Sequence, residues 1–213
     1  MKPYYEADGV TIYHGDSTGA DIHADALITD PPYGIDHNTD YHFSGGAVPG
    51  NTYESIQGDA EPFDPARWLK YPTVVLWGAN NFSQHLSQGS WLVWDKRSPS
   101  GSKNVMSDAE VAWMSRGHGV YIFAHTWDGF NRASERQTHY HPTQKPVALM
   151  RWVLERATKP GDVVFDPYMG SGPLARACLD MGRRYIGIEL VEAYCEAAVN
   201  RLGQGVLDLG GAA

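Results

Sequence analysis

The chain has 213 residues, of which 42% are hydrophobic and 20% are charged, and its formal net charge is −8 at pH 7. It contains no run of about 18 apolar residues, so the sequence predicts a soluble globular protein without a membrane-spanning segment. The length predicts a single domain, and the negative charge argues against a protein that holds nucleic acid through a broad basic surface.

Short apolar runs alternate with helix-like stretches along the chain. The expected strands are residues 10–14, 26–29, 73–77, 91–94, 120–124, 163–166 and 184–189. Apolar residues at three-to-four spacing predict helices at 64–70, 107–116, 146–157, 172–182 and 191–202. Ser107 with Glu110 three residues later has the spacing of a capping box, and Pro146 suits a first helical position. Strands that alternate with helices predict a mostly parallel sheet with helices on both faces.

Three polar stretches interrupt this pattern, at 34–63, 95–104 and 125–140. A loop of about 30 residues in a compact domain is usually functional, so we expect these segments to face a substrate. Residues 1–90 carry 3 basic and 12 acidic side chains, a net charge of −9, whereas residues 91–213 carry 14 and 13, a net charge of +1. The candidates for phosphate contacts are Lys96, Arg97, Lys103, Arg132 and Arg136.

The domain is expected to cover residues 1–202, with a flexible tail at 203–213. Cys178 and Cys195 lie in expected helices, and we interpret them as small buried residues because no disulfide or redox pattern surrounds them. The first residues lack the apolar stretch of a secretory signal, which predicts a cytoplasmic protein. His139 and His141 have no carboxylate or cysteine nearby to complete a ligand set, so no metal site is expected.

A turn with the sequence Asp30-Pro31-Pro32-Tyr33 follows the expected strand at 26–29. The two prolines fix the backbone and remove two N–H donors, which leaves a stiff turn rich in acceptors. The Asp30 carboxylate and the Pro31 carbonyl can accept both hydrogens of one NH2 group, and Tyr33 offers a ring on which a base can stack. Holding both N–H bonds out of the ring plane favours the tetrahedral nitrogen that attacks an electrophile. The turn therefore predicts a site for a planar amine.

A second turn, FDPYMGSG at 165–172, joins an expected strand to an expected helix. Its glycines let a cofactor lie against the backbone and meet the N–H groups of the helix N-terminus. Glu189, 17 residues after Gly172, ends the next strand and can accept two hydrogen bonds from ribose hydroxyls. No Gly-Lys-Ser/Thr follows, so the cofactor is expected to be a nucleoside without phosphates. Because ligands of parallel sheets collect beyond the carboxyl ends of the strands, both turns should face one crevice.

Together, DPPY at 30–33 and FDPYMGSG at 165–172 resemble the motifs of the DNA amino-methyltransferase family, which uses S-adenosylmethionine. The order, with DPPY first, is similar to the β group of that family. Further matches are HPTQKP at 141–146, HGD at 14–16 and GIEL at 187–190. The resemblance implies an α/β, circularly permuted Rossmann-like class I methyltransferase fold, with a mostly parallel seven-stranded sheet and helices on both faces. The β group commonly inserts a target-recognition domain before HPxxKP, where this chain has only about 16 residues (125–140), so it resembles a small form of the group.

The resemblance also implies roles for individual residues. The catalytic turn that binds the target base would be formed by Asp30, Pro31, Pro32 and Tyr33. Asp16 would contact the cofactor adenine, Glu189 the ribose, Thr143 and Lys145 the carboxylate, and Phe165 the methionine portion. The other expected cofactor contacts are Asp30, Asp166, Pro167, Gly170, Ser171, Gly172 and Leu190.

The activity implied by the resemblance is transfer of a methyl group from S-adenosylmethionine to N6 of adenine in DNA, with the base flipped out of the duplex. Transfer would be a direct in-line displacement. N4 of cytosine is the alternative, because both bases present the same NH2 group. RNA or protein glutamine as substrate, and a noncatalytic DNA-binding relative, rank lower. DNA is the expected partner, recognised site-specifically or loosely, as in restriction-modification. A homodimer would let so compact an enzyme embrace the duplex.

Overall fold

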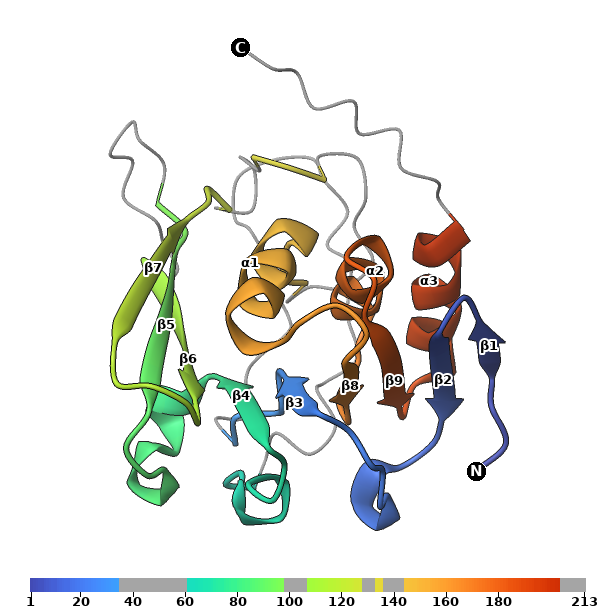
Figure 1. Ribbon diagram of the computed structural model, residues 1–213, viewed down its shortest axis with the longest axis horizontal. Coiled ribbons are helices and arrows are strands. Elements are labelled where there is room, and N and C mark those ends of the chain that lie inside the picture. The colour runs from blue at the N-terminus through green and yellow to red at the C-terminus, as the bar shows by residue number, and fades with distance from the viewer. Residues whose placement is uncertain (35–60, 98–106, 128–132, 136–143, 204–213) are drawn as a thin grey trace, which may run out of the picture.

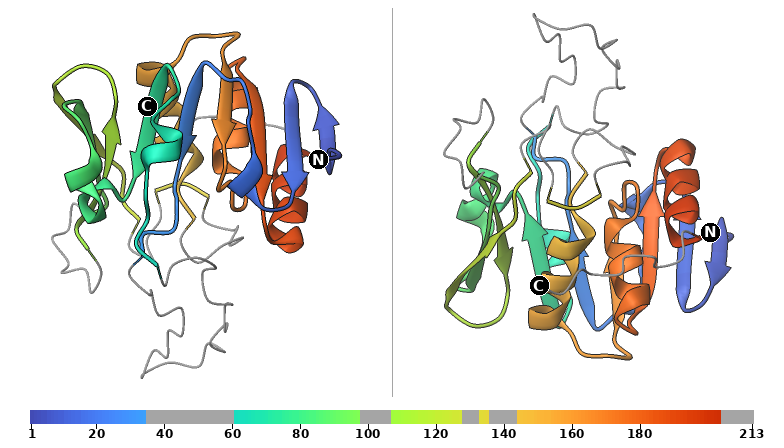
Figure 2. Two further views of the ribbon diagram at one scale, coloured as in Figure 1. Left: turned by 90° about the horizontal axis from the view of Figure 1, so that it is seen from below. Right: turned by 90° about the horizontal axis from the view of Figure 1, so that it is seen from above.

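A computed structural model describes residues 1–34, 61–97, 107–127, 133–135 and 144–203. Its strands form one nine-stranded sheet in the order β1-β2-β9-β8-β3-β4-β6-β5-β7. The strands are β1 (Tyr5–Ala7), β2 (Val10–His14), β3 (Ala26–Thr29), β4 (Thr73–Trp77), β5 (Ser90–Asp95), β6 (Ala109–Met114), β7 (Val120–Ala124), β8 (Val163–Asp166) and β9 (Arg184–Glu189). β1 and β7 lie at opposite edges (Figure 2).

The middle of the sheet is parallel. The consecutive pairs β2–β9, β9–β8, β8–β3 and β3–β4 are parallel, and in this register Leu27 of β3 lies opposite Phe165 of β8 and Val74 of β4. β3, from the beginning of the chain, therefore lies between β4 and the late strand β8, which is the permuted arrangement that the motif order predicts. β6 is antiparallel to both β4 and β5, and β1 is antiparallel to β2. All seven expected strands are present, and β1 and β6 are additional.

Three α-helices lie side by side along the sheet: α1 (Val147–Ala157), α2 (Pro173–Asp180) and α3 (Glu192–Gly203) (Figure 1). Their buried faces pack on alternate residues of the strands, such as Val75 and Trp77 of β4, in one hydrophobic cluster. The alternation of strand residues between the two faces places all three α-helices on the same face. Cys178 and Cys195 are buried in this cluster as free thiols, as expected.

The opposite face is covered differently from the expectation of helices on both faces. There Val74 and Leu76 of β4 pack with Trp68, Tyr71 and Phe82 in a second cluster. In the described part of the chain, the short 3-10 helices η2 (Ala66–Trp68) and η3 (Ala79–Asn81) contribute Trp68 and Ala79 to this cluster, and loop and strand residues supply the rest. Two further 3-10 helices, η1 (Ser17–Gly19) and η4 (Ser83–His85), contribute no residue to it. Large aromatic side chains supply the apolar area there that longer helices would otherwise bury.

The expected helix at 107–116 is wrong, because this segment forms β6 between β4 and β5. Ala112 and Met114 face one cluster and Trp113 faces the other, which is the period of a strand buried on both faces. The Ser107 hydroxyl donates to the Ala109 carbonyl instead of capping a helix. Glu110, read from the sequence as part of the cap, is free for another role.

Smaller differences concern helix starts and one short segment. The expected helix at 64–70 is only the 3-10 helix η2. Pro146 is extended at the N-cap of α1, one residue before the first helical position. Pro173, by contrast, is the first residue of α2. α3 packs against β2 and β9, so the end of the described chain lies beside the early strand β2, as the permutation predicts.

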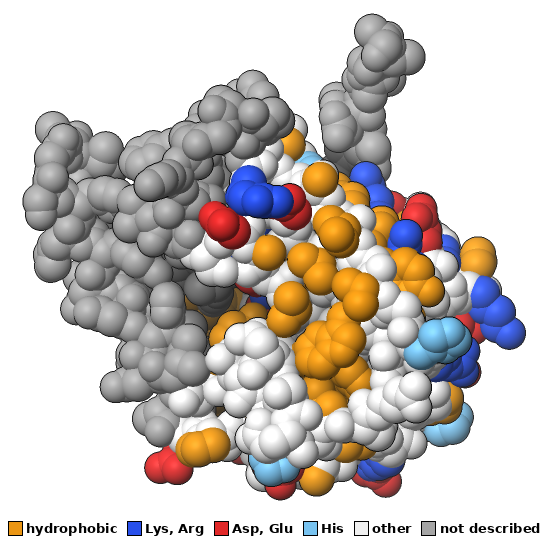
Figure 3. All heavy atoms as spheres, turned by 90° about the vertical axis from the view of Figure 1, so that its left-hand side faces the viewer, with side chains coloured by type: hydrophobic (Ala, Val, Ile, Leu, Met, Phe, Trp, Pro, Cys, Tyr) orange, Lys and Arg blue, Asp and Glu red, His pale blue; other side chains and the backbone are white. Residues whose placement is uncertain are grey.

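β7 leaves apolar side chains on the surface. Val120, Tyr121 and Ile122 are 65%, 42% and 67% exposed, although they are consecutive residues of an edge strand. Hydrophobic side chains gather over this side of the molecule (Figure 3). No helix in the described ranges is both long and apolar enough to cross a membrane.

Candidate active site

The candidate site lies where neighbouring parallel strands end. The Asp30 turn follows β3, and the glycine turn follows β8, the partner of β3 in the sheet. The Thr29 hydroxyl at the end of β3 donates to Oδ1 of Asp166 at the end of β8, at 2.6 Å. The two turns that the sequence singled out therefore adjoin at one edge of the sheet, as predicted.

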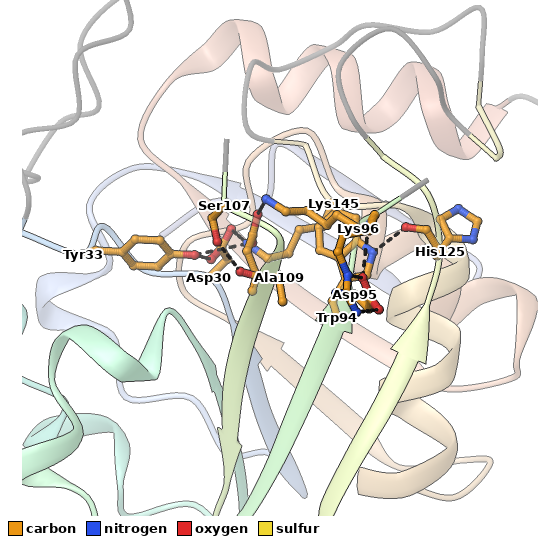
Figure 4. A network of polar contacts seen from close by, with 11 residues as sticks. Asp30, Tyr33, Trp94, Asp95, Lys96, Ser107, Ala109, His125 and Lys145 are labelled. Carbon is orange, nitrogen blue, oxygen red and sulfur yellow. Dashed lines mark hydrogen bonds and ion pairs between the residues drawn. The ribbon is translucent and has the colours of Figure 1, made fainter. Parts of the chain in front are cut away.

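The Asp30 turn is stiff and closely packed. The Tyr33 hydroxyl donates to Oδ1 of Asp30 at 2.6 Å, so the side chain points toward Asp30 (Figure 4). The ring rests against Gly78, which follows β4 and has a φ of 67°. A Cβ added to Gly78 would lie 2.0 Å from Cε1 of Tyr33, so only glycine leaves room for the ring there. Three neighbouring strands thus shape the turn: β3 carries it, β8 anchors it and β4 packs its ring.

A chain of alternating charges continues from Asp30 into the protein. The Lys145 ammonium pairs with Oδ2 of Asp30 and lies 3.3 Å from Oε2 of Glu110. Oε1 of Glu110 accepts from the Lys96 ammonium at 3.0 Å. Tyr33, Asp30, Lys145 and Lys96 follow one another in the same network (Figure 4). The chain begins at the end of β3 and ends beside β5 and β6.

The charges in this network support one another. Burial by itself would lower the pKa of Lys145, but the charges of Asp30 and Glu110 raise it above its ordinary value. Burial would likewise raise the pKa of Glu110, but Lys145 and Lys96 hold it below its ordinary value. Both groups are therefore charged at neutral pH.

The glycine turn borders open space. Gly170 has a φ of 55°, and a Cβ added there would meet no atom within 4 Å. Gly172 has a φ of 70°, and its Cβ would lie 2.7 Å from Cβ of Ala198 in α3. Gly172 is thus required for close packing, whereas Gly170 exposes its backbone at the strand ends, where a ligand can approach.

Two carboxylates line the same edge beyond β2 and β9. Oε2 of Glu189 accepts from the Gly170 N–H at 2.8 Å, and Oε1 accepts from the Val191 N–H at 2.9 Å, which ties the glycine turn to β9. Burial raises the pKa of Glu189 despite these bonds. Asp16 caps η1 and is exposed, and hydrogen bonds from Thr18 lower its pKa. Each carboxylate keeps lone pairs for hydroxyl or amine donors.

Asp166 is a buried carboxyl between the two turns. Burial raises its pKa from 3.8 to about 7, and the Asp30 charge acts in the same direction. The hydroxyls of Thr29 and Tyr185 and the N–H of Tyr168 donate to it and act in the opposite direction. The group is therefore poised to change its charge near neutral pH.

Two of the residue roles expected from the sequence do not fit the structure. Phe165 is fully buried against Trp68 and Tyr71, so its ring belongs to the core and has no surface to offer a cofactor. The Lys96 side chain is only 7% exposed and pairs with Glu110, so it is not available for a DNA phosphate. Arg97 is largely exposed and pairs with Asp95, so a phosphate contact there stays a prediction.

Lys145 also departs from its expected partner, because the carboxylates that it meets belong to Asp30 and Glu110. Several expectations concern residues outside the described ranges: Thr143, Lys103, Arg132, Arg136, His139 and His141, together with most of the loops 34–63, 95–104 and 125–140 and the tail 203–213. The described residues contain no group of three or more His, Cys, Asp or Glu side chains arranged to hold a metal.

Three residues that shape the site, Glu110, Thr29 and Gly78, belong to none of the family motifs in the sequence. Glu110 lies in AEVAWM, which lacks the apolar–polar alternation of a half-buried strand, so its place beside Lys145 follows only from the pairing of β6 with β4 and β5. Thr29 and Gly78 follow no motif, yet each stands at the end of an apolar strand, which is where site residues of parallel sheets collect.

Comparisons with known proteins agree with this geometry. A family model described as DNA methylase, N6_N4_Mtase, matches residues 119–200. The chain is 26% identical to the type II methyltransferase M2.LlaDCHI of Lactococcus lactis subsp. cremoris, covering 96% of this chain and 93% of the relative. It is 28% identical to the type II methyltransferase M.ScaI of Streptomyces caespitosus, covering 94% and 84%.

Solved structures show the same fold. PvuII DNA methyltransferase, described as cytosine-N4-specific, superposes with a TM-score of 0.63 at 17% identity, covering 99% of this chain and 91% of that one. M1.HpyAVI superposes with a TM-score of 0.55 at 23% identity, covering 91% and 98%. The fold is therefore the class I methyltransferase fold, in its permuted form and with nine strands in place of the expected seven.

Substitution of Asp166 by Asn should change how stability depends on pH. Between about pH 4 and 7 the folded carboxyl keeps a proton that the unfolded chain has lost, so the free energy of unfolding falls as the pH rises through this window. A pKa of about 7 in place of 3.8 corresponds to at most about 4 kcal/mol. Denaturant unfolding at several pH values should show a smaller fall for Asp166→Asn. The exposed Asp64→Asn serves as control, and an unchanged fall in Asp166→Asn would contradict this interpretation.

Proposed function

We propose that this chain, which belongs to the N6/N4 family of DNA amino-methyltransferases, transfers a methyl group from S-adenosylmethionine to N6 of adenine in DNA. The observation that carries the proposal is the meeting of the Asp30 turn and the glycine turn at the ends of the paired strands β3 and β8. One turn offers acceptors to an amine, and the other offers open backbone to a cofactor. Their adjacency is what a transfer between the two requires.

The residues at the ends of β8, β9 and β2 fit the cofactor. Gly170 borders open space, Glu189 lies beside it, and Asp16 lies farther along the edge, which supports contacts to the methionine, ribose and adenine portions in that order. S-adenosylmethionine, when bound, supplies an electrophilic methyl group. The chain's own part is to bind and orient this ligand through backbone groups and two carboxylates.

The residues at the ends of β3 and β4 fit the base. Asp30 and the Pro31 carbonyl would accept the two hydrogens of the exocyclic amine, and Asp30 can take up the proton that the nitrogen loses on methylation. Tyr33 would release Oδ1 of Asp30 as the amine arrives, and its ring would stack on the base. A base inside a duplex cannot reach this turn, so we infer that it is flipped out.

Adenine is proposed because the DPPY form of the turn resembles adenine enzymes more than cytosine ones. The amine of cytosine has the same two hydrogens, so N4 of cytosine is the alternative product. We infer that the segments 34–63, 95–104 and 125–140 recognise the DNA sequence, either site-specifically or loosely. We also infer a role in restriction-modification and a location in the cytoplasm, where the DNA substrate is.

The test of this proposal is to supply labelled S-adenosylmethionine with duplex DNA, single-stranded DNA, RNA or protein, and then to digest the labelled DNA to nucleosides. We expect label in DNA, recovered as N6-methyl-2'-deoxyadenosine. Recovery as N4-methyl-2'-deoxycytidine would establish the alternative. Label only in RNA or protein, or no transfer at all, would contradict a DNA methyltransferase.

Asp30→Ala should abolish transfer, because Asp30 holds the amine. It should leave cofactor binding nearly intact, because Asp30 follows β3 and the glycine turn that binds the cofactor follows β8. A loss of about 1,000-fold in kcat or more is expected from removing an acceptor made for the transition state. Turnover and calorimetric cofactor binding measure the two effects, with Asp64→Ala at the surface as control. Comparable turnover by Asp30→Ala would show that Asp30 is misassigned.

We further infer a homodimer formed through β7, because Val120, Tyr121 and Ile122 expose apolar surface on a strand that pairs with β5 alone among the described strands. A second copy of the strand would cover these side chains and complete the backbone hydrogen bonds. Ile122→Glu would place a charge in this contact. Sedimentation equilibrium should show a dimer for the wild type and a monomer for Ile122→Glu, whereas a monomeric wild type at tens of micromolar would rule this inference out.

A further inference from the structure

We propose that Lys145 is a positioning residue for Asp30: it holds the carboxylate in the orientation that receives the target amine, and Glu110 anchors Lys145 in turn. The proposal rests on the proposed function of the Asp30 turn and adds two residues to its machinery. Neither residue belongs to that turn, since Lys145 precedes α1 and Glu110 lies in β6.

Lys145 uses all of its hydrogen-bond donors within this network. An ammonium group has three N–H bonds. In this structure they meet Oδ2 of Asp30, Oε2 of Glu110 at 3.3 Å and the Tyr33 hydroxyl at 3.3 Å. The side chain is only 5% exposed. All three donors are therefore used by groups of the base-binding turn and its support.

The charges of the network balance one another. Lys96, Glu110, Lys145 and Asp30 alternate in sign and sum to zero, so each of the two buried ammonium groups has a partly buried carboxylate beside it. With Asp30 as its only partner, the Lys145 ammonium could move with its flexible side chain. Glu110 holds the ammonium from the other side, and Lys96 holds Glu110. The antiparallel strand β6 brings Glu110 to this place, which explains why a strand, and not a helix, is needed at 109–114.

The consequence for the reaction concerns the two oxygens of Asp30. With Oδ2 held by Lys145, Oδ1 remains as the oxygen for an incoming donor, and the Tyr33 hydroxyl occupies it in this structure. An amine that replaces this hydroxyl meets an acceptor already oriented and charged. Pre-orientation of this kind lowers the barrier, since nothing must rearrange as positive charge develops on the nitrogen.

The alternative is that Lys145 binds the carboxylate of the cofactor, as the sequence resemblance implies. In that case Lys145 would have to leave Asp30 and Glu110, and Asp30 would lose its ion pair while Glu110 kept the one with Lys96. The two alternatives predict opposite effects on kinetics, because one concerns cofactor affinity and the other concerns turnover.

Lys145→Met separates them. We expect kcat to fall by at least about 100-fold at saturating cofactor, while the calorimetric Kd of S-adenosylmethionine stays within about threefold of the wild type. Lys145→Arg, which keeps the charge, should recover part of kcat. The kcat of Glu110→Gln should lie between those of Lys145→Met and Lys145→Arg. The acid limb of the kcat–pH profile of Lys145→Met should move to higher pH, because Lys145 holds the pKa of Glu110 below its ordinary value and its loss lets that carboxyl protonate at higher pH. The charged groups facing this site are Asp30, Glu110, Lys96 and Asp166.

A Kd raised more than about tenfold with kcat near the wild-type value would overturn the proposal in favour of the cofactor carboxylate. Unchanged kcat and Kd would overturn it as well, as would full activity in Glu110→Gln together with an unmoved pH profile. Lys70→Met is the matched control: Lys70 pairs with Asp21 at the surface before β4, at the opposite ends of the strands. It should match the wild type in every assay.

A thermal readout separates this proposal from a failure of the proposed function. The charge of Glu110 contributes stability above its unfolded pKa, and this contribution is lost as the pH falls. The difference in Tm between wild type and Lys145→Met should therefore shrink below about pH 4. A constant difference would show that the ion-pair chain does not form, whatever the substrate. If the difference in Tm shrinks but the protein methylates no DNA, the ion-pair chain is present and only the proposed function is contradicted.

Discussion

The site depends on the pairing of β3 with β8. These strands come from opposite ends of the chain, and their parallel register sets Thr29 beside Asp166 and so fixes the two turns that follow them. A shift of one residue in this register would turn every side chain to the other face and separate the turns. The buried residues of β3, all four of which are enclosed, make such a shift costly. Packing of the core thus determines the geometry of the chemistry.

Around this pair the edge of the sheet divides into two parts. Beyond β8 lie the open backbone of Gly170 and the carboxylates of Glu189 and Asp16. Beyond β3 lie Asp30, the Tyr33 ring against Gly78, and the charged chain that begins with Lys145. Asp166 stands between the parts, where its burial and its nearness to Asp30 raise its pKa to about 7. Charge in one part can therefore influence the other through a short, buried path.

Much of this arrangement could be predicted from sequence because it depends on local patterns. Apolar runs such as TVVLW mark strands, and DPPY and MGSG mark the turns that follow them, so the seven expected strands and the meeting of the two turns were correct. The prediction of a helix at 107–116 was wrong for two reasons. A strand buried on both faces loses simple apolar–polar alternation, and a chance Ser-x-x-Glu resembled a capping box. The partners of Lys145 and the burial of Phe165 and Lys96 depend on tertiary packing, which no local pattern contains.

The central claim is that cofactor and base are brought together at the ends of β8 and β3. A crystal structure with S-adenosylhomocysteine bound tests it most directly. The account predicts adenosine beside Glu189 and Asp16, and a sulfur within roughly 8 Å of the Asp30 carboxylate, since one methyl group and one amine must fit between them. A ligand bound elsewhere, or a sulfur directed away from Asp30, would contradict the account.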